Sequence, residues 1–198
     1  NLILRTISFV GKVIIQGVIN GIVSHWIITN IEHLTLNDKT QQHVKLTSSA
    51  DYVAALDTIC KMANHSLLIF EKDFVNIGFN SEARFEVLRS FLLGNPNNRL
   101  QLLAHDTRPI SQYCPRLITL LRQFGHNMLI HQTPKNLQHL TEPFAVADDS
   151  HYVRRFHFDD TRGIQAQNDG EGARLLKSRF IEMWEASHPS ASTSTLTL

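Results

Sequence analysis

Apolar residues recur along most of the chain in two alternating patterns, one helical and one extended. From Ser48 or Ser49, either of which can cap a helix, they return every three or four residues to about residue 63, which predicts an amphipathic helix. The run SLLIFE from Ser66 follows, and its lack of polar interior positions is typical of a strand covered on both faces. The chain then repeats this order of helix and strand.

Two further helices are predicted, from about Ser81 to Gly94 and from Pro115 to Gly125, because a glycine ends each periodic stretch. Each is followed by an apolar strand, RLQLLAH after the first and NMLIHQ after the second. PFAVAD, a turn and HYVRRFHF then predict a β-hairpin, and a last helix is expected from about Glu171 to Ser187. The predicted fold class is α/β, with a mixed, mostly parallel sheet flanked by helices on both faces.

The first part of the chain departs from this alternation. Val13–Ile31 holds no Lys, Arg, Asp or Glu, and Arg5 and Lys12 precede it. Three interpretations remain open: a membrane anchor, an apolar arm packed on the domain or a partner, and an extension foreign to the folded unit. We expect this segment over residues 1–34, a linker or edge strand over 35–47, the α/β domain over 48–188 and a loose Ser/Thr-rich tail over 189–198.

Composition narrows the classes of function. With 198 residues and 42% hydrophobic content, the chain is long enough to bury the core of one domain. Its net charge of +1 excludes the overall basic field of a dedicated nucleic-acid binder, so any polyanion site is local. Cys60 and Cys114 are too few for a disulfide framework and are typical of a reducing compartment such as the cytoplasm. No spacing is typical of a metal or cofactor site, and we predict neither.

Polar residues follow each predicted strand, and ligands of open α/β sheets gather at the carboxyl ends of the strands. These residues are Glu71 and Asp73, His105 and Asp106, His131, and Asp148 with Asp149. Imidazoles and carboxylates that converge at one edge can support acid–base or nucleophilic phosphoryl chemistry. Solvated loop residues would give the same pattern, because His and Asp favour turns.

The second strand of the hairpin interleaves basic and aromatic residues. Alternation places Tyr152, Arg154, Phe156 and Phe158 on one face, and His151, Val153, Arg155 and His157 on the other. The candidate ligands of a phosphate group are Arg154, Arg155, His157 and the nearby Arg162. The alternative is a salt-bridged hairpin, in which these arginines are neutralised by Asp148, Asp149, Asp159 and Asp160.

The stretch TEPFAVAD resembles part of the phospholipase D superfamily motif His-x-Lys-x-x-x-x-Asp, which runs into an apolar strand. Aligning the motif on Asp148 places Thr141 at the position of the nucleophilic histidine and Pro143 at that of the lysine that holds the phosphate. His139 lies two residues too early, a shift of roughly 6–7 Å along an extended chain. The resemblance therefore implies a degenerate motif that has lost both catalytic side chains.

A closer resemblance covers the chain from about Lys45 to its end. The stretches LLAHD, CPRLITLLRQFGH, FAVADDSHYVRRFHFDDTRG and FIEMWEASHP are similar to an uncharacterised proteobacterial group of phospholipase D-like domains. Members of that group are sometimes fused to GNAT-type acetyltransferases. This resemblance implies a phospholipase D-like fold. It does not indicate a particular activity.

The preferred hypothesis is a catalytically degenerate phospholipase D-like domain that acts as a binding or regulatory module. Its ligand would bear phosphate, as a nucleic acid or a lipid headgroup does. One alternative is an active phosphodiesterase or transferase, with His105, His131 or His151 as nucleophile or acid and Asp148 as orienting carboxylate. Because superfamily enzymes generally combine two motifs, such an enzyme would act as a homodimer. A third hypothesis is an interaction module for an acetyltransferase, with membrane association through residues 13–31.

Overall fold

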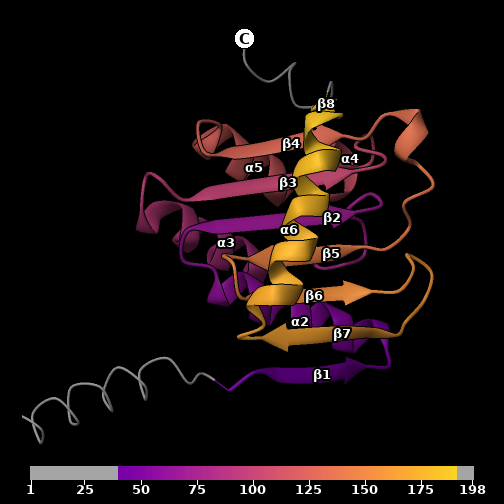
Figure 1. Ribbon diagram of the computed structural model, residues 1–198. Helices are drawn as coiled ribbons and strands as arrows, with labels where there is room; N and C mark the ends of the chain where they lie inside the picture. The colour runs from indigo at the N-terminus through magenta and orange to yellow at the C-terminus, as the bar shows by residue number, and fades with distance from the viewer. Residues whose placement is uncertain (1–39, 191–198) are drawn as a thin grey trace, which may run out of the picture. The chain divides into compact units, whose positions relative to one another are not determined.

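The computed structural model describes residues 40–190, in which eight strands form one mixed sheet with helices on both faces (Figure 1). The strands are β1 (Gln42–Leu46), β2 (Ser66–Glu71), β3 (Arg99–Ala104), β4 (Met128–Gln132), β5 (Phe144–Ala147), β6 (His151–Arg155), β7 (Gly163–Gln167) and β8 (His188–Pro189). The helices are α2 (Ser49–Met62), α3 (Glu82–Gly94), α4 (Ile110–Tyr113), α5 (Pro115–Phe124) and α6 (Gly170–Glu185), with a 3₁₀ turn, η1 (Lys135–Leu137). The predicted α/β class, with a mixed sheet flanked by helices on both faces, is confirmed. The sheet was expected to be mostly parallel, but the strand pairing within residues 40–190 is mostly antiparallel. The predictions for residues 1–34 and for most of the tail lie outside the described residues.

The helix boundaries follow capping residues in the sequence. The Ser48 hydroxyl accepts a hydrogen bond from the Asp51 N–H, and the Asp51 carboxylate accepts one from the Ser48 N–H, which forms a capping box at the start of α2. Ser81 caps α3 by accepting from the Arg84 N–H. Pro115 occupies the first turn of α5, where a backbone N–H has no helical partner. These three helices lie close to their predicted positions.

The strand order is β1-β7-β6-β5-β2-β3-β4-β8. Parallel pairing is limited to β2, β3 and β4, and the other neighbouring pairs within residues 40–190 are antiparallel. The predicted hairpin is observed as β5 and β6, with Phe144 opposite Arg154 and Ala147 opposite His151. Its second strand ends at Arg155, earlier than predicted. Residues 42–46, for which a linker and an edge strand were both considered, form β1 at one end of the sheet.

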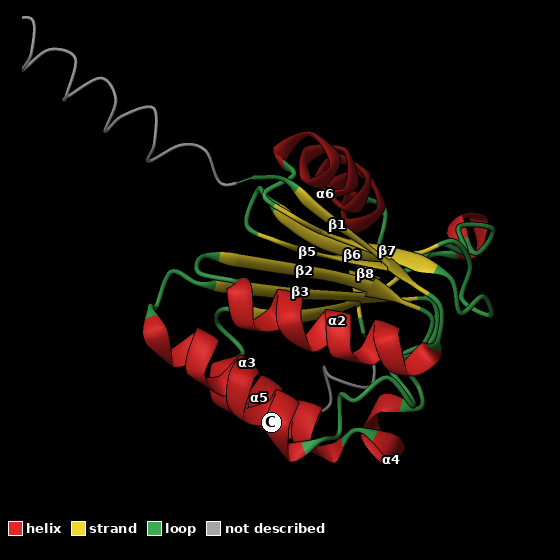
Figure 2. Cartoon of the chain, turned by 90° about the horizontal axis from the view of Figure 1, so that it is seen from below, coloured by secondary structure: helices red, strands yellow, loops and turns green. Residues whose placement is uncertain are grey.

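Two hydrophobic cores lie on opposite sides of the sheet. Helices α2, α3 and α5 cover one side, and α6 covers the other (Figure 2). Neighbouring residues of β2 point to opposite sides, so Ile69 belongs to the core under α2 and Phe70 to the core under α6. Because the central strands are covered on both sides, their sequences are continuously apolar.

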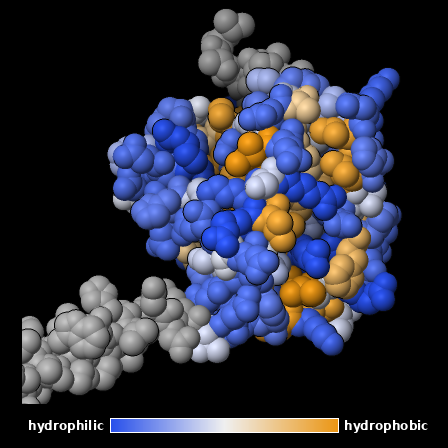
Figure 3. Space-filling model, in the orientation of Figure 1, coloured by the Kyte–Doolittle hydropathy of each residue, from blue (hydrophilic) through white to orange (hydrophobic). Residues whose placement is uncertain are grey.

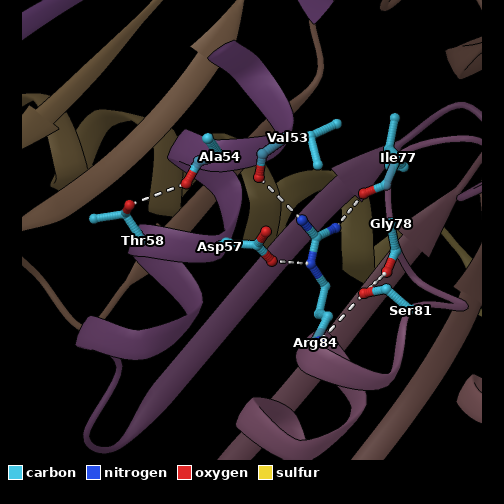
Figure 4. A network of polar contacts seen from close by, with 8 residues as sticks. All are labelled: Val53, Ala54, Asp57, Thr58, Ile77, Gly78, Ser81 and Arg84. Carbon is cyan, nitrogen blue, oxygen red and sulfur yellow. Dashed lines mark hydrogen bonds and ion pairs between the residues drawn. The ribbon is translucent and has the colours of Figure 1, made fainter. Parts of the chain in front are cut away.

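Arg84 of α3 is buried and joins helix α2 to the loop after β2 (Figure 4). Its Nε donates to Asp57 Oδ1 of α2 at 2.7 Å, its Nη2 donates to the Val53 carbonyl at 3.1 Å, and its Nη1 donates to the Ile77 carbonyl. Gly78 in the same loop has φ of +87°, and a Cβ added there would lie 3.1 Å from the guanidinium of Arg84. The network therefore fixes the loop that begins at the carboxyl end of β2.

Asp169 ties β1 and β6 to the start of α6. Its Oδ1 caps the helix by accepting from the Gly172 N–H at 2.9 Å, and its Oδ2 accepts from the Tyr152 hydroxyl at 2.9 Å. His43 Nε2 of β1 lies 2.9 Å from the same Oδ2. Burial raises the pKa of Asp169, but the hydrogen bonds from Gly172, His43 and Tyr152 outweigh it and lower this pKa to about 2.

Exposed apolar residues of the domain are scattered. Hydrophobic residues on the side that carries α6 form small groups among hydrophilic ones (Figure 3). Leu175 and Ile181 of α6 are 69% and 45% exposed. Among residues 40–190, no helix has both the length and the apolar character needed to cross a membrane.

Candidate functional site

A pocket of about 610 Å³ opens at the edge of the sheet where the parallel strands end. Strands β2, β3 and β4 run in the same direction, so the loops that follow them meet at this edge. The segments before β5 and after β6 complete the wall. The charged residues that line the pocket are Lys72, Asp106, Arg108, Lys135 and Asp159, with His105 and His157.

His105 is a buried imidazole of this pocket, and both of its ring nitrogens have partners. Nε2 lies 2.7 Å from the Leu140 carbonyl, which can only accept, so Nε2 carries the proton. Nδ1 lies 2.5 Å from the Thr133 hydroxyl, which donates to it. Burial lowers the pKa of His105 and keeps the ring neutral. A nucleophilic imidazole needs a free lone pair, and His105 has none available in this arrangement.

Two lysines of the pocket have no carboxylate partner. Within residues 40–190, neither Lys72, which follows β2, nor Lys135, which follows β4, forms an ion pair. Arg108, by contrast, makes two hydrogen bonds of 2.9 and 2.7 Å to the carboxylate of Asp106. The pocket thus offers two ammonium groups whose charge is not neutralised by a neighbour. Sequence reasoning missed both lysines, although Lys72 directly follows a predicted strand.

The segment after β6 gives the pocket an aromatic surface. The Phe158 ring lies 5.4 Å from the His105 ring, centroid to centroid, and its backbone N–H donates to the Thr141 carbonyl at 2.8 Å. Thr141 therefore lines the pocket beside Phe158. His157 Nδ1 accepts from the Asp159 N–H at 3.0 Å, so the neutral His157 ring presents its other nitrogen as a donor.

Asp148 and His151 lie at the opposite edge of the sheet, so the structure does not bring all the strand-end residues together. Because β5 runs antiparallel to β2, its end lies beside the start of β2. The Asp148 carboxylate accepts from the backbone N–H groups of Asn64, His65 and Ser66 at 2.8–3.0 Å. Burial raises the pKa of Asp148, but these hydrogen bonds outweigh it and lower the pKa. The length of β2, roughly 16 Å, separates this edge from the pocket.

His131 of β4 takes part in the packing of α6 on the sheet. Its ring stacks on Trp184 of α6, with centroids 3.8 Å apart and an interplanar angle of 10°. Burial lowers the pKa of His131, and the neighbouring His188 adds to this effect. Across the part of the chain that the structure describes, no group of three or more His, Cys, Asp or Glu residues is arranged to hold a metal ion.

The four basic residues expected to bind phosphate do not share one site. Arg154 and Arg155 point to opposite sides of the sheet. The Arg154 guanidinium packs over the Phe156 ring at 5.7 Å, and Arg162 pairs at 2.7 Å with the aspartate two residues before it. His157 is the member of the four that lines the pocket. Neutralisation by a flanking aspartate, the alternative considered for the hairpin, is observed for Arg162.

Glu71 and Arg155 meet on the α2 side of the same edge. The Tyr52 hydroxyl donates to Glu71 Oε1 at 2.5 Å, and Arg155 Nη2 lies 3.6 Å from Glu71 Oε2. Burial raises the pKa of Glu71 to about 7, although the Tyr52 hydrogen bond and the charge of Arg155 act in the other direction. This cluster is buried, and its three residues, Tyr52, Glu71 and Arg155, are not among those that line the pocket.

Solved structures of the same fold define the class of this domain. TrmBL2, an archaeal chromatin protein described with a novel mode of DNA binding, aligns over 88% of this chain and 66% of its own, with 11% identity and a TM-score of 0.58. Nuc of Salmonella typhimurium, a phospholipase D family member, aligns over 76% of this chain and 97% of its own, with 10% identity and a TM-score of 0.54. Phosphatidylserine synthase of Haemophilus influenzae Rd KW20 aligns over 81% and 42%, with 16% identity and a TM-score of 0.52. The domain therefore has a phospholipase D-like fold, as expected.

The chain belongs to the DUF7931 family, a domain of unknown function, whose family model matches residues 48–196. The comparison with curated proteins gave no sequence match. At sequence identities of 10–16%, the structural similarity shows the fold alone, because proteins of one fold can differ in activity.

Proposed function

We propose that this domain binds a phosphate-bearing ligand in the pocket at the carboxyl edge of β2, β3 and β4, and that it does not catalyse phosphoryl transfer. One observation carries the proposal. Lys72 and Lys135 are cations without a carboxylate partner in a pocket whose buried imidazole, His105, is engaged at both ring nitrogens. Such a site can hold a phosphate group by charge-assisted hydrogen bonds but lacks a nucleophile to attack it.

The alignment with the phospholipase D motif supports the same conclusion. Thr141 takes the position of the nucleophilic histidine in that alignment, and Thr141 lines this pocket. A threonine hydroxyl cannot replace the imidazole without an adjacent general base, and the ring of His105 is already committed to Thr133 and Leu140. Pro143, at the position of the lysine, brings no charge. The degenerate motif is therefore part of the proposal.

The enzymatic alternative requires an imidazole and a carboxylate that act together. Asp148 and His151 lie one strand length from the pocket, and His131 is stacked on Trp184. Among the residues that the structure describes, 40–190, no specific contact favours this alternative. Homodimer formation, membrane association through residues 13–31 and the acetyltransferase partner remain predictions.

Binding of the full chain to two probes tests the proposal and separates the two sources of phosphate. One probe is a fluorescein-labelled single-stranded oligonucleotide, and the other is a vesicle that contains phosphatidylserine. The Lys72→Gln/Lys135→Gln variant should bind the preferred probe at least tenfold more weakly than the parent. The matched control, Lys61→Gln/Arg122→Gln, removes the same charge from exposed positions outside this pocket and should bind like the parent.

For the oligonucleotide, the salt dependence gives a second readout. Each phosphate contact contributes about 0.7 to the slope of log K against log salt concentration, so the loss of both lysines should reduce the slope by about 1.4. Equal affinities and slopes for the two double variants would refute the lysine site. Turnover of bis(p-nitrophenyl) phosphate by the parent, abolished by His105→Asn, would refute the absence of catalysis.

A further inference from the structure

Within residues 40–190 two arginines, Arg84 and Arg155, are buried, and their hydrogen bonding differs. Each of the three guanidinium nitrogens of Arg84 donates to an oxygen. Arg155 is 8% exposed, yet within residues 40–190 its side chain makes no hydrogen bond, and its Nε is buried without a partner. A guanidinium carries five N–H donors and keeps its charge at any physiological pH. A buried guanidinium whose N–H donors lack acceptors would be stabilised by a ligand that brings several oxygen atoms.

The groups around Arg155 contact its side chain but accept no hydrogen bond from it. Its Nη2 lies 3.6 Å from Glu71 Oε2, which is beyond hydrogen-bonding distance. The Tyr52 hydroxyl holds the Glu71 carboxylate through the other oxygen at 2.5 Å. The guanidinium carbon of Arg155 lies over the Tyr52 ring, 4.3 Å from its centre, in a cation–π contact. Within residues 40–190, the guanidinium donors of Arg155 therefore have no oxygen acceptor at hydrogen-bonding distance.

We propose that Arg155 binds an oxyanion with two negative charges, such as sulfate or a phosphate monoester, and that Glu71 takes up one proton when the anion binds. A dianion beside an ionised Glu71 would be repelled, and protonation removes this repulsion. A protonated Oε2 also donates a hydrogen bond to the anion, while Oε1 still accepts from Tyr52. This site lies on the α2 side of the sheet and goes beyond the lysine pocket proposed above.

The charges around Glu71 are consistent with this exchange. Tyr52 faces it from α2, Arg155 faces it from β6, and Asp73 lies after the end of β2. Burial is the largest influence and raises the pKa of Glu71 to about 7, and Asp73 acts in the same direction. Proton uptake therefore falls within the range of pH in which the folded protein can be studied.

Sulfate is the probe for this site, because it stays a dianion between pH 6 and pH 8. The full chain is titrated by calorimetry in the Lys72→Gln/Lys135→Gln background, so the lysine pocket does not contribute. With a pKa near 7, the protonated fraction of Glu71 falls from about 0.9 at pH 6 to about 0.1 at pH 8, and the apparent affinity should fall about tenfold. Buffers with different ionisation enthalpies should report the uptake of about one proton at pH 8.

Two variants in this background decide the outcome. Glu71→Gln keeps an acceptor for Tyr52, and its sulfate affinity should change less than about twofold between pH 6 and pH 8. Arg155→Lys keeps the charge but loses the planar fork and should weaken binding more than tenfold. The control Arg154→Lys, whose side chain lies on the other side of the sheet, should bind sulfate like the background protein.

The proposal is overturned if the background protein fails to bind sulfate at pH 6. It is equally overturned if Glu71→Gln keeps the tenfold pH dependence, or if a folded Arg155→Lys binds sulfate like the background protein. Near-ultraviolet circular dichroism reports folding, and if Arg155→Lys does not fold, Glu71→Gln alone decides. Because both lysines are absent throughout, failure here leaves the lysine pocket untouched, and failure of that pocket leaves this site untouched.

Discussion

Removal of the charge of Asp57 tests how the buried Arg84 is stabilised. Asp57 Oδ1 accepts from Arg84 Nε at 2.7 Å, and the side chains of Arg84 and Asp57 are 0% and 35% exposed. In Asp57→Asn an amide oxygen can still accept, but the guanidinium remains charged and buried without a countercharge. Breaking a fully buried pair costs about 3–5 kcal/mol. Because a third of Asp57 is open to solvent and an acceptor remains, we expect the free energy of unfolding to fall by about 2–3 kcal/mol.

Urea unfolding followed by far-ultraviolet circular dichroism measures this change. With a denaturant dependence of about 1–3 kcal/mol per molar urea, the midpoint should fall by roughly 0.7–3 M. The Asp57→Asn/Arg84→Met variant should lose less stability than the sum of its single variants, because it contains no buried charge. The control Asp159→Asn alters a side chain that is 79% exposed and should stay within about 0.5 kcal/mol of the parent.

Two results would refute this reasoning. One is an Asp57→Asn variant with the midpoint of the parent, which would mean that Asp57 does not compensate the charge of Arg84. The other is strict additivity in the double variant, which would mean that the two side chains are not coupled.

Three further predictions concern the backbone and the acid limit of stability. Gly78→Ala should lower the free energy of unfolding by about 1–2 kcal/mol, because its φ of +87° disfavours a side chain and the new Cβ would lie 3.1 Å from Arg84. Gly163→Ala should cost more than about 2 kcal/mol, since its Cβ would lie 2.4 Å from the Arg154 carbonyl oxygen; parental stability in urea would contradict the observed register of β6 and β7. The pKa of Asp169 is lowered from 3.8 to about 2, so its contribution of about 2 kcal/mol is complete above pH 4 and is lost as the pH falls through 2. In Asp169→Asn the free energy of unfolding should therefore depend less on pH between pH 2 and pH 5. The same pH dependence as in the parent would contradict the lowered pKa of Asp169.

The elements with strong local signals could be predicted from the sequence. SLLIFE forms β2 as predicted, and Ser48, Ser81 and Pro115 start helices because capping preferences are local. β7 was missed, since its sequence GIQAQ is half polar and one of its polar residues, Gln165, is buried within the sheet. The hairpin partner of β5 was predicted too long, because the alternation of HYVRRFHF continues past the point where the chain leaves the sheet.

The site was harder to predict, because it depends on strand direction and burial. His105 and Asp106 were placed correctly beside the carboxyl end of a parallel strand. Asp148 follows an apolar strand in the same way, yet it lies at the other edge, since β5 is antiparallel to β2. Burial of Arg84 and Arg155 leaves no local pattern, because arginine is usually exposed and its burial depends on partners distant in sequence.

The role of Asp148 has a consequence for how such motifs are used in classification. Its carboxylate accepts hydrogen bonds from three consecutive backbone N–H groups at the start of β2. These bonds connect the turn between β5 and β6 to β2 in the middle of the sheet. These hydrogen bonds stabilise the sheet whether or not any reaction takes place at the other edge. Asp148, which aligns with the aspartate of the phospholipase D motif, therefore has an architectural role in this protein, and its presence alone is not evidence of enzymatic activity.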